Sequence, residues 1–147
     1  MLIAGIPGAG KSTFGRWLAD EHNLDHIDLD REPYRLDPTT WAPRTVLDWG
    51  FLLATLPFVR SLVADGVEHW WFDGDRDAAH ESFGSRKDHP GNEGAWRIQL
   101  AAVEEHWDEI AALFAGRIID VISAGPTYVS NEERLAEMQR RGFRVSS

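Results

Sequence analysis

The segment GIPGAGKS at residues 5–12 constrains this chain more than any other part of it. It fits the pattern G-x-x-x-x-G-K-[ST], in which glycines let the backbone adopt positive φ and turn successive N–H groups toward phosphate. An apolar run over residues 2–6 precedes the lysine, and an amphipathic stretch over 11–22 follows from it. The order predicts a strand, a phosphate-binding loop, and a helix whose positive N-terminal end faces the same anion.

The residue types in this loop predict ATP and Mg²⁺ as cofactors. Lys11 is a mobile cation for the β and γ phosphates, and the hydroxyl of Ser12 is a ligand for Mg²⁺. With average residue usage, such a pattern arises by chance in roughly one chain in two hundred of this length, before its context is counted. The predicted nucleotide-binding residues of the segment are Gly5, Pro7, Gly8, Ala9, Gly10, Lys11, Ser12 and Thr13.

The rest of the chain alternates short apolar runs with amphipathic stretches, which predicts an α/β fold with a mainly parallel sheet and helices on both faces. At 147 residues we expect one domain, residues 1–147. Strands are predicted near residues 2–6, 26–29, 45–48, 68–73 and 117–123. Helices are predicted near residues 11–22, 55–65, 77–86 and 95–115, and a last one starts at a capping box of Ser130 and Glu133.

Composition narrows the classes of partner. The net charge of −9 disfavours bulk nucleic-acid binding, although a local basic pocket for one nucleotide is compatible with it. There are no cysteines, which excludes disulfides and thiolate metal sites, and the six histidines form no convincing metal set. Without an apolar run of roughly 20 residues or a secretory signal at residues 1–6, we expect a cytoplasmic protein that does not enter a membrane.

Three further segments carry a resemblance to a known family. They are VLDWGF at residues 46–51, FD at 72–73 with a helix leading to Arg86, and IDVI at 119–122 followed by Gly125 and Pro126. The guanine-recognition element N-K-x-D is missing, as is the L-S-G-G-Q segment of transporter ATPases. The chain resembles the adenylate-kinase-like small P-loop kinases, a group of P-loop NTPases that includes the shikimate and gluconate kinases.

The resemblance implies roles for residues outside the loop. Asp48 would help Ser12 hold Mg²⁺, partly through water. Arg86 would bind phosphate when a short lid over residues 87–94 closes, and Pro126 would lie in the loop that touches adenine. In adenylate kinases a second arginine stacks on the base, and Ser82 occupies that position here, so the stacking residue stays open.

The acceptor side is predicted at Asp28-Leu29-Asp30-Arg31, which follows the second strand. In a parallel α/β sheet this position opens onto the crevice at the strand carboxyl ends. A carboxylate there can accept the proton of an attacking hydroxyl, and Asp30 is the first choice, with Asp28 as the alternative. Arg31, Arg35 and Arg44 are candidates to hold an anionic acceptor or a transferring phosphoryl group.

Two tryptophans and two further aspartates each have more than one possible role. Trp41 and Trp49 lie in segments that face the crevice and could stack on an acceptor ring, although for Trp49 a core position is favoured. Asp73 and Asp75 bracket Gly74, and helix capping is the favoured role of these carboxylates.

Together these residues predict an ATP-dependent phosphotransferase that moves the γ-phosphoryl group onto a small-molecule or nucleotide acceptor, with Lys11, Asp30 and Arg86 as catalytic residues. Two alternatives remain: a kinase of polynucleotide 5′-hydroxyls or modified DNA, and a regulatory nucleotide-binding ATPase without an acceptor. The acceptor, the preference among triphosphates and the oligomeric state stay open.

Overall fold

The computed structural model describes residues 1–32, 36–84 and 93–145. In chain order the strands are β1 (Leu2–Gly5), β2 (Asp25–Asp28), β3 (Thr45–Trp49), β4 (His69–Gly74), β5 (Ile118–Ser123) and β6 (Thr127–Tyr128). The α-helices are α1 (Lys11–His22), α2 (Leu56–Ala64), α3 (Arg76–Gly84), α4 (Glu93–Glu105), α5 (Trp107–Leu113) and α6 (Asn131–Arg140). Short 3₁₀ turns lie at Pro38–Thr40 and Leu53–Thr55.

The strands form one sheet in the order β2-β3-β1-β4-β5-β6. The first five strands are parallel to their neighbours, and only β6 runs antiparallel to β5. The predicted α/β class with five parallel strands is therefore confirmed, with one short strand added at the edge. Two residues are too few to show an alternating apolar pattern, so β6 could not be read from the sequence.

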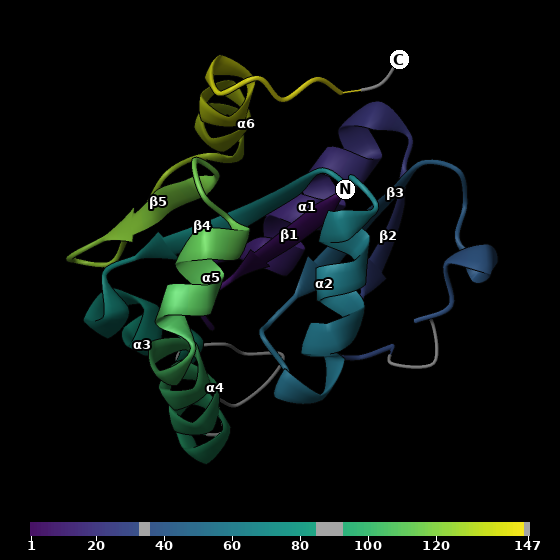
Figure 1. The fold of residues 1–147 in the computed structure, drawn as a ribbon. Coiled ribbons are helices and arrows are strands. Elements are labelled where there is room, and N and C mark those ends of the chain that lie inside the picture. The colour runs from purple at the N-terminus through teal and green to yellow at the C-terminus, as the bar shows by residue number, and fades with distance from the viewer. Residues whose placement is uncertain (33–35, 85–92, 146–147) are drawn as a thin grey trace.

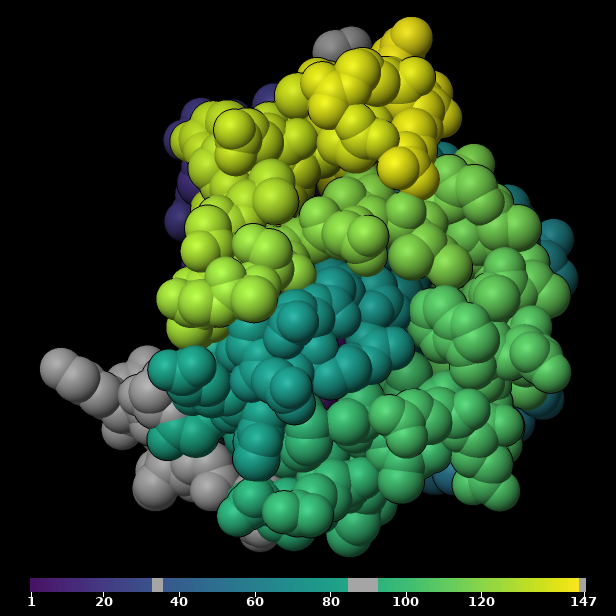
Figure 2. Space-filling model, turned by 90° about the vertical axis from the view of Figure 1, so that its left-hand side faces the viewer, coloured from purple at the N-terminus to yellow at the C-terminus, as the bar shows by residue number. Residues whose placement is uncertain are grey.

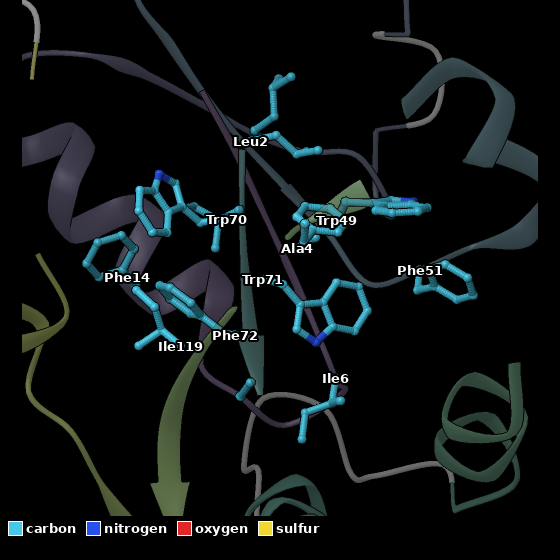
Figure 3. Close-up of a cluster of buried hydrophobic side chains, with 14 of the residues drawn as sticks. Leu2, Ala4, Ile6, Phe14, Trp49, Phe51, Trp70, Trp71, Phe72 and Ile119 are labelled. Carbon is cyan, nitrogen blue, oxygen red and sulfur yellow. The ribbon is translucent and has the colours of Figure 1, made fainter. Parts of the chain in front are cut away.

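Helices cover both faces of the sheet, with α1 on one side and α2 and α5 on the other (Figure 1). Strand β4 shows why, because its aromatic residues alternate between the faces. The ring of Phe72 packs against Phe14 of α1, and Trp71 points to the other side of the strand (Figure 3). There the ring of Trp71 packs against Trp107 and Phe114 at α5. All three aromatic residues of β4, including Trp70, are fully buried. The core therefore lies on both sides of β4, the strand that pairs with β1.

The helix expected over residues 95–115 is broken in two. His106 has φ −105° and ψ 18°, outside the α-helical region, and separates α4 from α5. Its ring Nδ1–H donates a 3.0 Å hydrogen bond to the carbonyl of Ala102, and the ring packs on Phe51 across the core. The break keeps the apolar residues on the inner face, which is why their spacing suggested a single helix.

Helix ends mostly follow the sequence signals. The capping box of Ser130 and Glu133 is present at α6, and Asp75 accepts the backbone N–H of Ala78 at the start of α3. Thr55, which the sequence predicts as the N-cap of α2, does not fill this role, because its hydroxyl makes no capping hydrogen bond. It donates instead to the carbonyl of Leu52 and accepts the indole N–H of Trp49.

Candidate functional site

The glycine loop leaves the sheet at the carboxyl end of β1 and leads directly into α1. Gly8 and Gly10 have φ of 86° and 74°, conformations that L side chains rarely adopt. A Cβ on Gly8 would also lie 2.4 Å from the carbonyl oxygen of Ala79 in α3. The structure therefore requires glycine at position 8 for both backbone conformation and space.

Lys11 opens α1 and its side chain turns back over the loop, where Nζ donates a 2.9 Å hydrogen bond to the carbonyl of Ile6. The residue is about 9% exposed, so its charge is held at the loop rather than in bulk solvent. The N-terminus of α1 adds the partial positive charge of the helix dipole at the same place. This is an arrangement that attracts phosphate.

Ser12 and Asp48 are brought together from α1 and β3. The hydroxyl of Ser12 donates a 3.1 Å hydrogen bond to Oδ1 of Asp48, which is only 1% exposed. His26 of β2 lies on the other side of the carboxylate, with Nε2 2.6 Å from Oδ2. A Cβ on Gly15 would lie 2.9 Å from this Nε2, so the glycine in α1 leaves space for the imidazole.

The donor set of this pair fits Mg²⁺, which prefers hard oxygen ligands and keeps several waters and phosphate oxygens. In the described residues no group of three or more His, Cys, Asp or Glu side chains could hold a metal by itself. A hydroxyl and a buried carboxylate at the phosphate loop suit an ion that is held mainly by nucleotide and water.

Asp28 ends β2, Asp30 lies two residues further on, and the two carboxylates take different roles. Oδ1 of Asp28 accepts the backbone N–H groups of Asp30 and Arg31, so this carboxylate shapes the turn. Oδ2 of Asp30 accepts the N–H of Gly50 at 2.7 Å, and Oδ1 of Asp30 is buried without a hydrogen-bond partner among the described residues. Burial raises the pKa of Asp30 to about 6, against the opposing effect of the Lys11 charge. A buried oxygen without a partner is a place for a substrate hydroxyl.

These groups line one cavity of about 160 Å³. Its floor is the loop and the ends of β2 and β3, and its far wall is made by Phe83 of α3 and by Ala95 and Gln99 of α4. Eight of the residues singled out from the sequence meet here: Pro7, Gly8, Lys11, Ser12, Asp28, Asp30, Arg31 and Asp48. Residues from four separate parts of the chain therefore converge on the phosphate loop.

Other predicted residues do not join this cavity. Trp49 is fully buried, so it is a core residue and the expectation that it contacts an acceptor is wrong. Arg44 lines a separate hollow with Met1 and Phe143 at the opposite ends of the strands. Trp41 packs edge-on against Phe58. Arg35, Arg86 and most of the lid expected over residues 87–94 lie outside the described residues.

A second, larger hollow of about 580 Å³ lies on the other side of the loop. Gly8, Gly10 and Thr13 form its loop side, and Ser82 of α3 lines it. The remaining wall comes from β6 and the start of α6: Tyr128, Val129, Ser130, Asn131, Glu132 and Arg134. Figure 2 shows the yellow-green segment between β5 and α6 lying over the teal α3 on this face. Pro126 lies in the turn before β6 and does not line the hollow.

The sequence reading missed His26, Tyr128 and Arg134. For Arg134 the sequence contains one usable signal, which is its place four residues before Met138. Residues four apart lie on the same face of a helix, and in the structure both are buried on the inner face of α6. An arginine on the buried face of an amphipathic helix calls for a specific partner. Nothing in the spacing of His26 or Tyr128 points to the residues they contact.

Comparisons with known proteins match part of the sequence and the fold of this chain. The shikimate kinase family profile matches residues 7–35, which contain most of the loop, α1, and Asp28 and Asp30. Shikimate kinases of Staphylococcus aureus strains JH9 and Newman are 46% identical over 39 residues, or 24% of this chain. The matched segment is only 22% of the length of those relatives.

The structural comparison extends over nearly the whole chain. A gluconokinase from Sinorhizobium meliloti 1021 superimposes with a TM-score of 0.58 over 95% of this chain and 90% of that one, at 17% sequence identity. At this identity the match shows a shared fold. The resemblance to small P-loop kinases of the shikimate and gluconate kinase type is thus confirmed, by local sequence and by overall fold. Among the described helices none is both long and apolar enough to cross a membrane.

Proposed function

We propose that this protein is an ATP- and Mg²⁺-dependent phosphotransferase that moves the γ-phosphoryl group onto a hydroxyl of a small acceptor. The observation that carries the proposal is the unpartnered Oδ1 of Asp30, which lies buried at the cavity that Lys11 and Ser12 also line. A carboxylate next to a phosphate loop is the arrangement that phosphoryl transfer to a hydroxyl needs.

In the proposed reaction the acceptor oxygen attacks the γ-phosphorus, the bond to the oxygen of ADP breaks, and the acceptor proton passes to Oδ1 of Asp30. The hydrogen bond from Gly50 to Oδ2 keeps the carboxylate oriented. Lys11 and the loop amides hold the phosphates. Ser12 and Asp48 would hold Mg²⁺, which when bound neutralises charge on the phosphate oxygens. Arg86 remains the proposed second cation of the transfer.

The size of the cavity supports a small acceptor. A volume of about 160 Å³ suits one small molecule or part of one. The net charge of −9 disfavours a polyanionic acceptor. The larger hollow of about 580 Å³, on the other side of Gly8, is the proposed place of the nucleoside.

The test is a screen of hydroxyl and phosphate acceptors with γ-labelled ATP, run beside an acceptor-free ATPase assay. Transfer of label to a small acceptor, abolished in Lys11→Ala, is the expected result. Full turnover in Lys11→Ala would overturn the role of the loop. Hydrolysis without transfer to any acceptor would indicate a regulatory ATPase. Label on an oligonucleotide, with binding that weakens steeply as salt rises, would indicate a polynucleotide kinase.

A further inference from the structure

Side chains from the C-terminal part of the chain donate hydrogen bonds to three successive carbonyl groups of the phosphate loop. The phenol of Tyr128 donates a 2.6 Å hydrogen bond to the carbonyl of Gly8. The guanidinium of Arg134 donates through one NH₂ group to the carbonyls of Ala9, at 3.1 Å, and Gly10, at 3.4 Å. These contacts join residues 120 or more positions apart in the sequence.

The contacts act on the phosphate side of the loop because a peptide unit is planar. Its C=O and N–H point in opposite directions, so holding the carbonyl fixes where the next N–H points. The carbonyls of Ala9 and Gly10 belong to the peptide units that carry the N–H groups of Gly10 and Lys11. Arg134 thereby orients two of the amides that a phosphate-binding loop offers to its ligand.

Arg134 is held rigidly enough for this task. The residue is only 3% exposed, and Nε donates a further hydrogen bond to the carbonyl of Val129. Its guanidinium lies 5.2 Å from the ring centre of Phe72 and 5.8 Å from that of Tyr128. Burial lowers the pKa of Arg134 to about 10, which leaves the side chain charged at neutral pH. Gly10 permits the approach, since a Cβ there would lie 3.3 Å from the guanidinium.

We propose that Tyr128 and Arg134 are positioning residues that preorganise the phosphate loop from its carbonyl side. Both residues also line the 580 Å³ hollow on that side of the loop. The wall of the proposed nucleoside pocket and the phosphate loop are therefore one hydrogen-bonded unit. The inference rests on the proposed function, because it assumes that the loop binds the phosphates of a nucleotide.

The experiment uses inorganic tripolyphosphate with Mg²⁺, a probe that has the phosphate chain of ATP and no nucleoside to fill the hollow. Calorimetry measures the dissociation constant of tripolyphosphate for each variant. The temperature is one at which urea unfolding curves show that every variant is folded. Tyr128→Phe removes one neutral hydrogen bond and should weaken binding by about 2- to 10-fold. Arg134→Met should weaken it by at least about tenfold, since hydrogen bonds from a charged donor contribute more.

Two further variants separate geometry from charge. Arg134→Lys keeps the charge but cannot reproduce the planar fork, so it should bind tripolyphosphate as weakly as Arg134→Met does. Arg140→Met removes the same charge from the exposed side of α6, where Arg140 pairs with Glu137, and should bind like the unchanged protein. Amide hydrogen exchange should be faster at Ala9 in Tyr128→Phe and at Gly10 and Lys11 in Arg134→Met, even without a ligand.

The outcomes are distinguishable. If the unchanged protein binds neither tripolyphosphate nor ATP, the proposed function fails and this inference fails with it. If it binds both and Tyr128→Phe and Arg134→Met bind equally well, the inference alone is overturned. The inference would also be overturned if Arg134→Lys bound tripolyphosphate as tightly as the unchanged protein. The charge of residue 134, and not the position of its hydrogen-bond donors, would then account for its effect on binding. If Arg134→Met does not fold, Tyr128→Phe with its exchange measurement decides.

Discussion

His26 holds the carboxylate of Asp48 from the side opposite to Ser12, through a 2.6 Å contact between Nε2 and Oδ2. The other oxygen of Asp48 accepts the hydroxyl of Ser12. A carboxylate with a hydrogen-bond partner on each oxygen is held in one orientation. Residues that orient a metal-binding side chain in this way contribute to its affinity for the metal. The space for the imidazole exists because residue 15 has no side chain.

Gly15→Ala should displace His26 and weaken the response to Mg²⁺. The new Cβ would lie 2.9 Å from Nε2, so the ring must move away from Asp48. We expect the Mg²⁺ concentration for half-maximal nucleotide binding to rise by about tenfold, in line with losses of groups that orient metal ligands. Calorimetric titration of ATP at several Mg²⁺ concentrations measures this.

Gly84→Ala is the matched control, because a Cβ there meets nothing within 4 Å in the described part of the chain. It should leave the Mg²⁺ response unchanged. An unchanged response in Gly15→Ala as well would mean that His26 does not orient Asp48.

Gly8→Ala should destabilise the fold beyond the cost of its backbone conformation. The Cβ would lie 2.4 Å from the backbone of Ala79, and φ is 86°. Gly116→Ala isolates the conformational part, since Gly116 has φ of 75° and a Cβ there meets nothing within 4 Å in the described residues. We expect a loss of about 1 kcal/mol for Gly116→Ala and about 3 kcal/mol for Gly8→Ala in urea unfolding. Equal losses would argue against the close approach of the loop and α3.

Asp30 should make turnover depend on pH near 6. Its pKa is raised to about 6 by burial, and a proton acceptor must be ionised to work. The rate should therefore rise with pH up to about 6 and level off above it, provided transfer itself limits the rate. Asp30→Asn should lose about 10²- to 10⁴-fold in kcat and lack this dependence. A flat profile in the unchanged protein would remove Asp30 from the role of base.

The Asp30 carboxyl should also make the stability of the fold depend on pH. Turnover should rise with pH, whereas the stabilising contribution of Asp30 should fall. A carboxyl whose folded pKa is raised binds its proton more tightly in the folded state, so its stabilising contribution is full below about pH 4 and is lost as pH rises through about 6. Above pH 6 the folded protein bears the cost of a partly buried charge. Asp30→Asn should then be more stable by about 1–3 kcal/mol at pH 8 and by less at pH 4. Denaturant unfolding at the two pH values measures the difference, and a greater gain at pH 4 would contradict it.

Trp49→Phe should affect stability and spare the acceptor. The indole N–H donates to Thr55 inside the core, and the residue has no exposed surface. Loss of this hydrogen bond and of ring volume should cost about 1–3 kcal/mol. The KM for whichever acceptor the screen identifies should change less than about twofold, because a buried side chain cannot contact it. A large change in KM with little loss of stability would return Trp49 to the acceptor site.

The parts of the molecule that the sequence predicted are those written in local patterns. The loop, the five parallel strands and the capping box at Ser130 depend on residues within a few positions of each other. The pairing of Ser12 with Asp48 was also accessible, because the resemblance to small kinases supplied it and the structure places the two side chains 3.1 Å apart.

The parts that escaped depend on contacts between distant residues. Tyr128 meets Gly8 across 120 positions, and no periodicity carries that information. The space that Gly15 leaves for His26 is visible only once α1 lies against β2 and β3. The break at His106 preserves the phase of the apolar residues, so the sequence could not separate α4 from α5.

Among the described residues, the hollow of about 580 Å³ and the cavity of about 160 Å³ share one lining residue, Gly8. For the proposed transfer this means that neither substrate has to pass through the place of the other to arrive or depart. A ternary complex can then assemble in either order, and the phosphoryl group can cross in one step with no phosphorylated form of the protein in between.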